Sequence, residues 1–101
     1  MRTLIVLKDK DPEPLGTAEA LRKKGEDVAL VLMLDAVYMA TGTDKNVSVK
    51  RMMEGGVGFI LLKRDVERRG LETRLLPGVE LVEHEKLIDI LFTEDQRVLN
   101  L

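Results

Sequence analysis

Between residues 30 and 40, a run of apolar residues stops at one carboxylate and then continues with helical spacing. Apolar residues up to Leu34 have the character of a buried strand, Asp35 interrupts them, and Ala36–Ala40 carry apolar side chains at the spacing of a helix. A strand therefore gives way to a helix at Asp35. In open parallel α/β sheets, ligands and partners bind at the carboxyl ends of the strands. We expect a functional edge to begin at this residue.

Short apolar runs and helical segments alternate along the whole chain. At the first helix, Asp11 and Pro12 provide an acceptor and a preset φ at the start, and Gly25 follows a group of cations at the end. Strands that alternate with helices pair in parallel through right-handed crossovers. We therefore predict one domain over residues 1–101, with a doubly wound, three-layer α/β/α fold and a mostly parallel sheet of four to five strands. The expected strands are Leu4–Leu7, Val28–Met33, Val57–Leu62, Val79–Val82 and a closing strand Arg97–Leu101. The later helices are expected at Asp35–Thr41, Val47–Glu54, Lys63–Arg69 and His84–Phe92, with a loop at Thr43–Asn46.

Charge and cysteine content restrict the possible function. The chain has 16 Lys and Arg against 18 Asp and Glu, and this net charge of -2 does not favour binding to DNA or to an anionic membrane. It has no Cys, so it cannot form a disulfide, a thiolate metal site or a cysteine nucleophile. No apolar run has the length of a signal peptide core or a membrane span, and a cytoplasmic location is expected.

Few residues are candidates for chemistry. Asp35 fits a helix N-cap as well as a catalytic or phosphate-accepting carboxylate. His84 lies between two glutamates in a first helical turn and is expected to be exposed and without a role. The basic pairs within Lys63–Arg69 are interpreted as the solvated face of a helix rather than as an RNA contact. One His without Cys does not supply a usual metal site, and no metal or cofactor is expected.

The methionines near the second and third helical segments allow two interpretations. Met39, Met52 and Met53 could cover an adaptable protein interface, or they could pack in an ordinary core. The sequence predicts more apolar surface here than one small core hides, and therefore a chain that is not a monomer.

Several short motifs together resemble one family. The segments that carry the likeness are Leu32–Val37 with Gly42 shortly after it, then Phe59–Leu71, then Val79–Val82. Their order and spacing are similar to the DsrH/TusB branch of the DsrE/DsrF/DsrH proteins. In that branch a strand ends in a Leu-Gln-Asp-Gly-Val-like sequence, and the third strand leads into a Glu-Asp-Leu-x-x-Arg-Gly-Leu-like helix. This chain departs from the pattern at Leu34, where the family often has Gln, at Ala36, where it often has Gly, and at Leu101, where relatives commonly end in Trp.

The resemblance implies a small subunit of a cytoplasmic sulfur-relay assembly. In such assemblies DsrE-like and DsrF-like subunits form oligomers with a DsrH-like one, and the DsrE-like subunit carries the persulfide cysteine. The sulfur serves tRNA wobble-uridine 2-thiolation in one branch and sulfur oxidation in another, so tRNA would be met only indirectly. A cysteine-free chain is then a non-catalytic accessory subunit. Its strand-end or docking site is expected at Asp35, Ala36, Tyr38 and Gly42.

Two other classes of function remain open at this level. A strand that ends in Leu-Met-Leu-Asp also resembles the phospho-acceptor segment of a response-regulator receiver, with Asp9 and Asp11 as a possible acidic pair. Alternatively, a free-standing small-molecule binding domain could use the same strand ends, because a fold does not fix a function.

Overall fold

The computed structural model describes residues 2–42, 47–93 and 96–100 and has the predicted α/β fold. Five strands form one sheet in the order β4-β3-β2-β1-β5, and every pairing is parallel. The strands are β1 (Arg2–Leu7), β2 (Asp27–Leu32), β3 (Gly58–Leu62), β4 (Glu80–Val82) and β5 (Gln96–Asn100). The helices are α1 (Glu13–Lys23), the 3-10 helix η1 (Leu34–Ala40), α2 (Val47–Glu54), α3 (Lys63–Arg68) and α4 (His84–Leu91).

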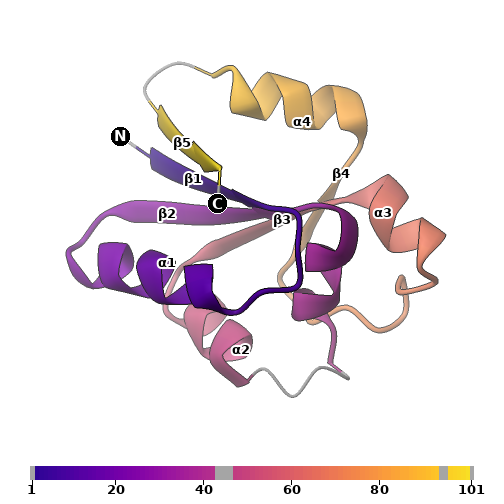
Figure 1. The fold of residues 1–101 in the computed structure, drawn as a ribbon, viewed down its shortest axis with the longest axis horizontal. Coiled ribbons are helices and arrows are strands. Elements are labelled where there is room, and N and C mark those ends of the chain that lie inside the picture. Colours follow the sequence, from indigo (N-terminus) through magenta and orange to yellow (C-terminus); the bar gives the residue numbers. More distant parts are fainter. Residues whose placement is uncertain (1, 43–46, 94–95, 101) are drawn as a thin grey trace.

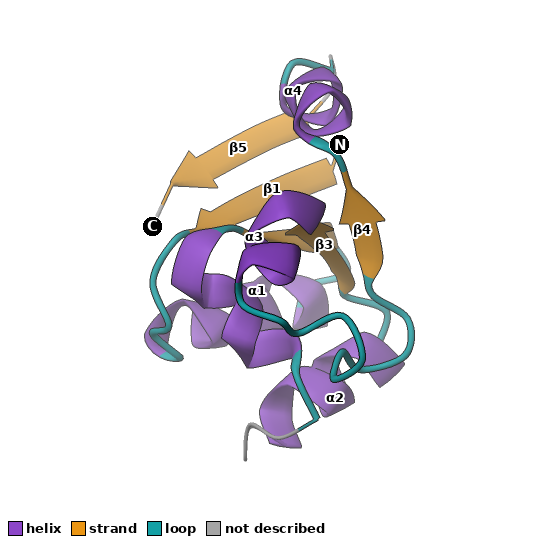
Figure 2. Cartoon of the chain, turned by 90° about the vertical axis from the view of Figure 1, so that its right-hand side faces the viewer, coloured by secondary structure: helices purple, strands orange, loops and turns teal. Residues whose placement is uncertain are grey.

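The helices divide unequally between the two faces of the sheet (Figure 1). The chain moves from β1 through β2 and β3 to β4 in one direction, so right-handed crossovers place the intervening helices on one face. The connection from β4 to β5 returns across the sheet, and α4 therefore lies on the opposite face. Figure 2 shows α4 on one side of the sheet and α1 and α2 on the other.

Two apolar clusters follow from this division, because successive residues of a strand point to opposite faces. On β1, Ile5 and Leu7 belong to the cluster under α1, η1 and α2, whereas Leu4 and Val6 belong to the cluster under α4. Strands β1, β2 and β3 are buried on both faces, as their continuous apolar runs predict.

Most expected elements lie within one or two residues of their observed bounds. The segment after β2 is helical as expected, but it is a 3-10 helix over Leu34–Ala40 and so begins one residue before Asp35. The carboxylate of Asp11 accepts a hydrogen bond from the Glu13 N–H at 3.0 Å, as expected for an acceptor at the start of α1. The expected loop Thr43–Asn46 and the last residue of the expected closing strand, Leu101, lie outside the described residues.

Candidate functional site

The carboxyl end of β2 contains a backbone conformation that leucine rarely adopts. Leu34 follows the strand directly and has a φ of 50°. The left-handed region costs a residue with a Cβ roughly 1–2 kcal/mol. The backbone N–H of Leu34 donates a hydrogen bond to Oδ2 of the Asp65 carboxylate, at a distance of 2.7 Å. This charge-assisted hydrogen bond offsets the strain and fixes the turn between β2 and η1.

Asp65 is a buried carboxylate with an incomplete set of partners. It lies in the first turn of α3 and is 1% exposed. Its Oδ2 accepts from Leu34, whereas its Oδ1 has no hydrogen-bond partner among the described residues and lies 3.9 Å from Nη1 of Arg69. A buried charge needs a nearby opposite charge, and Arg69 supplies it.

Arg69 joins two carboxylates from different elements. Its Nη1 donates to the backbone carbonyl oxygen of Asp65 at 3.1 Å. Its Nε and Nη2 both donate to Oδ1 of Asp35, at 3.1 Å and 2.9 Å. We call Asp35, Asp65 and Arg69 the edge triad. It connects η1 to α3 and carries one more negative than positive charge.

Asp35 does not have the capping role that sequence suggested. The N-cap of η1 is Met33, and no side chain caps this helix with a hydrogen bond. Asp35 lies within the first turn, and its carboxylate is held by Arg69 instead. Its side chain is 66% exposed, so the structure presents an oriented carboxylate at the carboxyl edge of the sheet.

The other predicted site residues have different surroundings. Ala36 is fully buried and belongs to the core. Tyr38 is half-buried, and the Lys10 ammonium lies 5.6 Å from the centre of its ring, which is cation–π distance. Gly42 is exposed, and its N–H donates to the carbonyl oxygen of Arg74 at 2.8 Å. Asp35 and Tyr38 thus offer polar surface, whereas Ala36 supports the helix from beneath.

Of the two interpretations of the methionines, core packing applies to Met39 and Met52. Met39 and Met52 are 1% and 3% exposed, and both belong to the core under the helices. Met53 is half-buried against that core. Their flexible thioethers fill the space between η1, α2 and the sheet. Other large apolar side chains are exposed among the described residues, namely Leu34, Leu81, Ile88 and Phe92.

The sheet order overturns the receiver interpretation. In a receiver-type sheet the first strand lies between the second and the third. Here β2 lies between β1 and β3. Within residues 2–42, 47–93 and 96–100, no three side chains of the metal-ligating types gather into a possible metal site, so Asp9 and Asp11 do not complete a receiver-like cluster with Asp35. In the part of the chain that the structure describes, no helix combines the length and apolar character that crossing a membrane requires.

The two residues that organise this edge, Asp65 and Arg69, are not among the predicted site residues. Asp65 and Arg69 lie in a segment interpreted as a solvated helix face, yet they are four residues apart and bridge to residues more than thirty positions earlier. The spacing of Asp65 and Arg69 indicates their pairing, since an acidic residue four positions before a basic one can form an ion pair on a helix. His84 is exposed, as expected.

The fold places the chain in a class of α/β domains, and sequence similarity places it in a family. An all-parallel five-stranded sheet with helices on both faces makes the chain a small open α/β domain. A family model described as "DsrH like protein" matches residues 15–97, and the chain belongs to this DsrH-like family. Membership supports, in general terms, a subunit of a sulfur-relay system.

Solved structures share the fold along the full length of the chain. The ychN protein from E. coli is 24% identical, with a TM-score of 0.75 and coverage of 100% of both chains. A protein of unknown function from Methanobacterium thermoautotrophicum is 18% identical, with a TM-score of 0.76 and coverage of 99% of this chain and 98% of the other. One from Bacteroides thetaiotaomicron is 12% identical, with a TM-score of 0.80 and coverage of 99% and 94%. None of the curated proteins matches the chain.

Proposed function

We propose that this chain is a non-catalytic subunit of a cytoplasmic sulfur-relay assembly, in which it supports persulfide transfer by a cysteine-bearing DsrE-like partner. The observation that supports this proposal is that a chain of the DsrH-like family contains no cysteine. Sulfur relay requires a thiolate that attacks a sulfane sulfur and becomes the new persulfide. This chain has no thiol and contributes shape and charge instead.

The edge triad is the proposed contact with the partner. Asp35 is oriented by Arg69 and remains largely exposed, so it can accept a hydrogen bond from a basic side chain or a backbone N–H of the partner. Leu34 stands beside it with 45% of its surface exposed. An exposed apolar side chain next to a fixed charge suits the centre of a protein interface.

Exposed apolar residues elsewhere favour association as well. Phe92 is 82% exposed, and Ile88 and Leu81 are also exposed on α4 and β4. We therefore propose DsrE-like and DsrF-like subunits, or further copies of this chain, as partners. The sulfur would serve tRNA wobble-uridine thiolation or sulfur oxidation, with tRNA met only indirectly.

Light scattering at micromolar concentration should give a mass well above the 11.4 kDa of one chain.

Co-purification at native expression level tests the proposal. We expect the chain to recover a relative of similar size that contains cysteine, and a radiolabelled sulfane sulfur donor to label that partner and not this chain. Recovery of the chain alone, at the mass of a monomer, would refute the proposal.

A pair of matched variants tests the docking edge. Asp35→Asn removes a charge at the carboxyl end of β2, whereas Asp27→Asn removes one from an exposed residue at the amino end of the same strand. We expect Asp35→Asn to weaken recovery of the partner severalfold, and Asp27→Asn to leave it unchanged. Equal effects would show that the edge triad is not the contact.

A further inference from the structure

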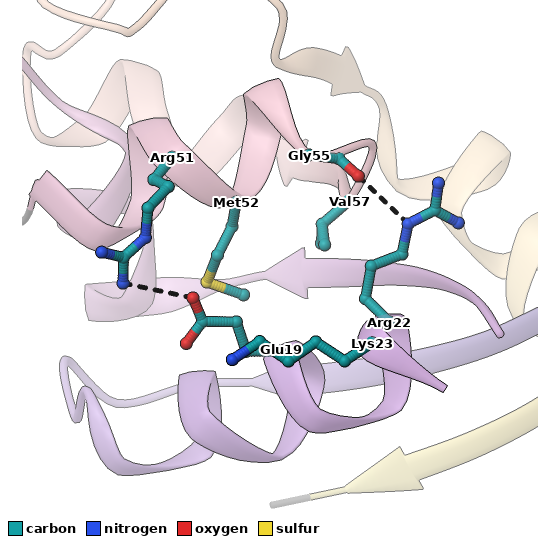
Figure 3. A pocket seen from close by; sticks show the side chains of 7 residues that line it. All are labelled: Glu19, Arg22, Lys23, Arg51, Met52, Gly55 and Val57. Atoms are coloured by element: carbon teal, nitrogen blue, oxygen red, sulfur yellow. Dashed lines mark hydrogen bonds and ion pairs between the residues drawn. The ribbon is translucent and has the colours of Figure 1, made fainter. Parts of the chain in front are cut away.

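A cleft lies between α1 and α2, away from the edge triad. It has a volume of about 590 Å³ and is formed where both helices end. Both ends lead into the starts of strands, so the cleft is at the amino edge of the sheet, opposite Asp35. The residues that line it are Glu19, Arg22, Lys23, Arg51, Met52, Gly55 and Val57 (Figure 3).

Arg22 is a fixed cation at one end of this cleft. Its Nε donates to the Gly55 carbonyl oxygen at 3.1 Å, and its Nη1 donates to the Glu26 carbonyl oxygen at 3.3 Å. Gly56 has a φ of 97°, and a Cβ at this position would lie 2.6 Å from Nη2 of Arg22. The absence of that Cβ lets the guanidinium lie against the turn, where it loses little further freedom when a ligand binds.

Arg51 and Lys23 bring further positive charge from the two helices. Arg51 pairs with Glu19 across the cleft at 3.2 Å, and 66% of its side chain is exposed (Figure 3). Each helix C-terminus contributes about half a negative charge. The cations Arg22, Lys23 and Arg51 outweigh Glu19 and the two helix ends by about one charge. The cleft therefore attracts an anion.

The floor of the cleft is apolar. Met52 and Val57 lie between the charged side chains but are only 3% and 4% exposed, so the apolar surface open to a ligand belongs to the aliphatic stems of Lys23 and Arg51 (Figure 3). A small inorganic anion would contact the charged groups alone and leave these stems exposed to water. A ligand with both an anionic group and an apolar or aromatic body uses both parts, and a planar body can also stack on a guanidinium.

We propose that this cleft binds an organic phosphate that carries an aromatic body, with the chemistry of a nucleotide. The phosphate lies against Lys23, Arg51 and the fixed Arg22, and the aromatic body packs on the exposed stems of Lys23 and Arg51. The same chemistry is offered by a free mononucleotide and by a nucleotide within an RNA strand. This inference does not depend on the proposed function, because no lining residue belongs to the edge triad.

Calorimetric titration of the full chain with three probes tests the composition of the ligand. AMP should bind more tightly than inorganic phosphate, which lacks the aromatic body, and more tightly than adenosine, which lacks the charge. Equal affinity for AMP and adenosine, or no binding of AMP at millimolar concentration, would overturn the proposal. A short single-stranded RNA identifies the source: tighter binding than AMP at the same residues assigns the cleft to RNA, and weaker binding assigns it to the free nucleotide.

Two pairs of charge variants locate the site. Lys23→Gln and Arg51→Gln each remove a cation that lines the cleft, and each should weaken AMP binding about tenfold, the usual loss for a hydrogen bond to a charged group. Their neighbours Lys24→Gln and Lys50→Gln remove the same charge from exposed residues outside the cleft and should change binding less than about twofold, as screened surface charges do. Equal losses in both members of a pair would assign the binding to diffuse surface charge and refute the site.

Discussion

Replacing Arg69 by methionine should destabilise the fold far more than any change at Asp35. Arg69→Met keeps most of the apolar stem but removes the cation that lies 3.9 Å from the buried Asp65 Oδ1. Among the described residues, the Asp65 carboxylate would then keep only the hydrogen bond from the Leu34 N–H. Removing one partner of a buried pair costs about 3–5 kcal/mol. Because 3.9 Å is long for an ion pair and Arg69 is 20% exposed, we expect the lower end, about 3 kcal/mol.

Asp35→Asn is the matched comparison on the same arginine. The Asp35 side chain is 66% exposed, and water can solvate the part of the Arg69 guanidinium that loses the Asp35 charge. Exposed ion pairs contribute about 0–1 kcal/mol, so this variant should lose less than about 1 kcal/mol. The two variants therefore separate a buried charge partner from an exposed one at a single guanidinium.

Urea unfolding followed by circular dichroism measures both variants. A loss of about 3 kcal/mol lowers the urea midpoint by roughly 1–3 M for a small domain. The double variant Arg69→Met with Asp65→Asn should be more stable than the sum of the single losses predicts, since it leaves no unpaired buried charge. A loss below about 1 kcal/mol for Arg69→Met, or equal losses for Arg69→Met and Asp35→Asn, would refute the reasoning.

Two further predictions use glycine positions and glycine substitutions as matched pairs. Leu34→Gly and Leu81→Gly remove leucines that are 45% and 39% exposed, but of the two only Leu34 has a positive φ. In urea unfolding, Leu34→Gly should therefore lose about 1–2 kcal/mol less stability than Leu81→Gly. Equal losses would show that the turn holds no strain. Gly56→Ala and Gly25→Ala both place a Cβ at positive φ, but only the Cβ at Gly56 would collide with Arg22. Gly56→Ala should therefore lower the stability by about 1 kcal/mol more than Gly25→Ala, and its thermal unfolding midpoint should be the lower of the two.

The local pattern of apolar residues was sufficient to predict the fold class. Residues such as Val28–Leu32 form a continuous apolar run of strand length, and the helices between such runs carry apolar residues on one face. Both signals depend only on neighbours a few positions apart. The spacing of the motifs within Leu32–Val82 also supported the family, which the family model confirms over residues 15–97.

The strand order and the candidate sites depended on contacts that no local pattern encodes. Among the described helices, only α4 lies on its face of the sheet, because the chain returns from β4 to β5. The position of β2 between β1 and β3 separates the fold from a receiver. The edge triad joins Asp35 to Arg69, and the cleft joins Arg22 to Gly55, each across more than thirty residues. Local propensity would not place Leu34 at a positive φ. The hydrogen bond from its N–H to Asp65 offsets that cost, and it exists only because the parallel sheet brings the ends of β2 and β3 side by side.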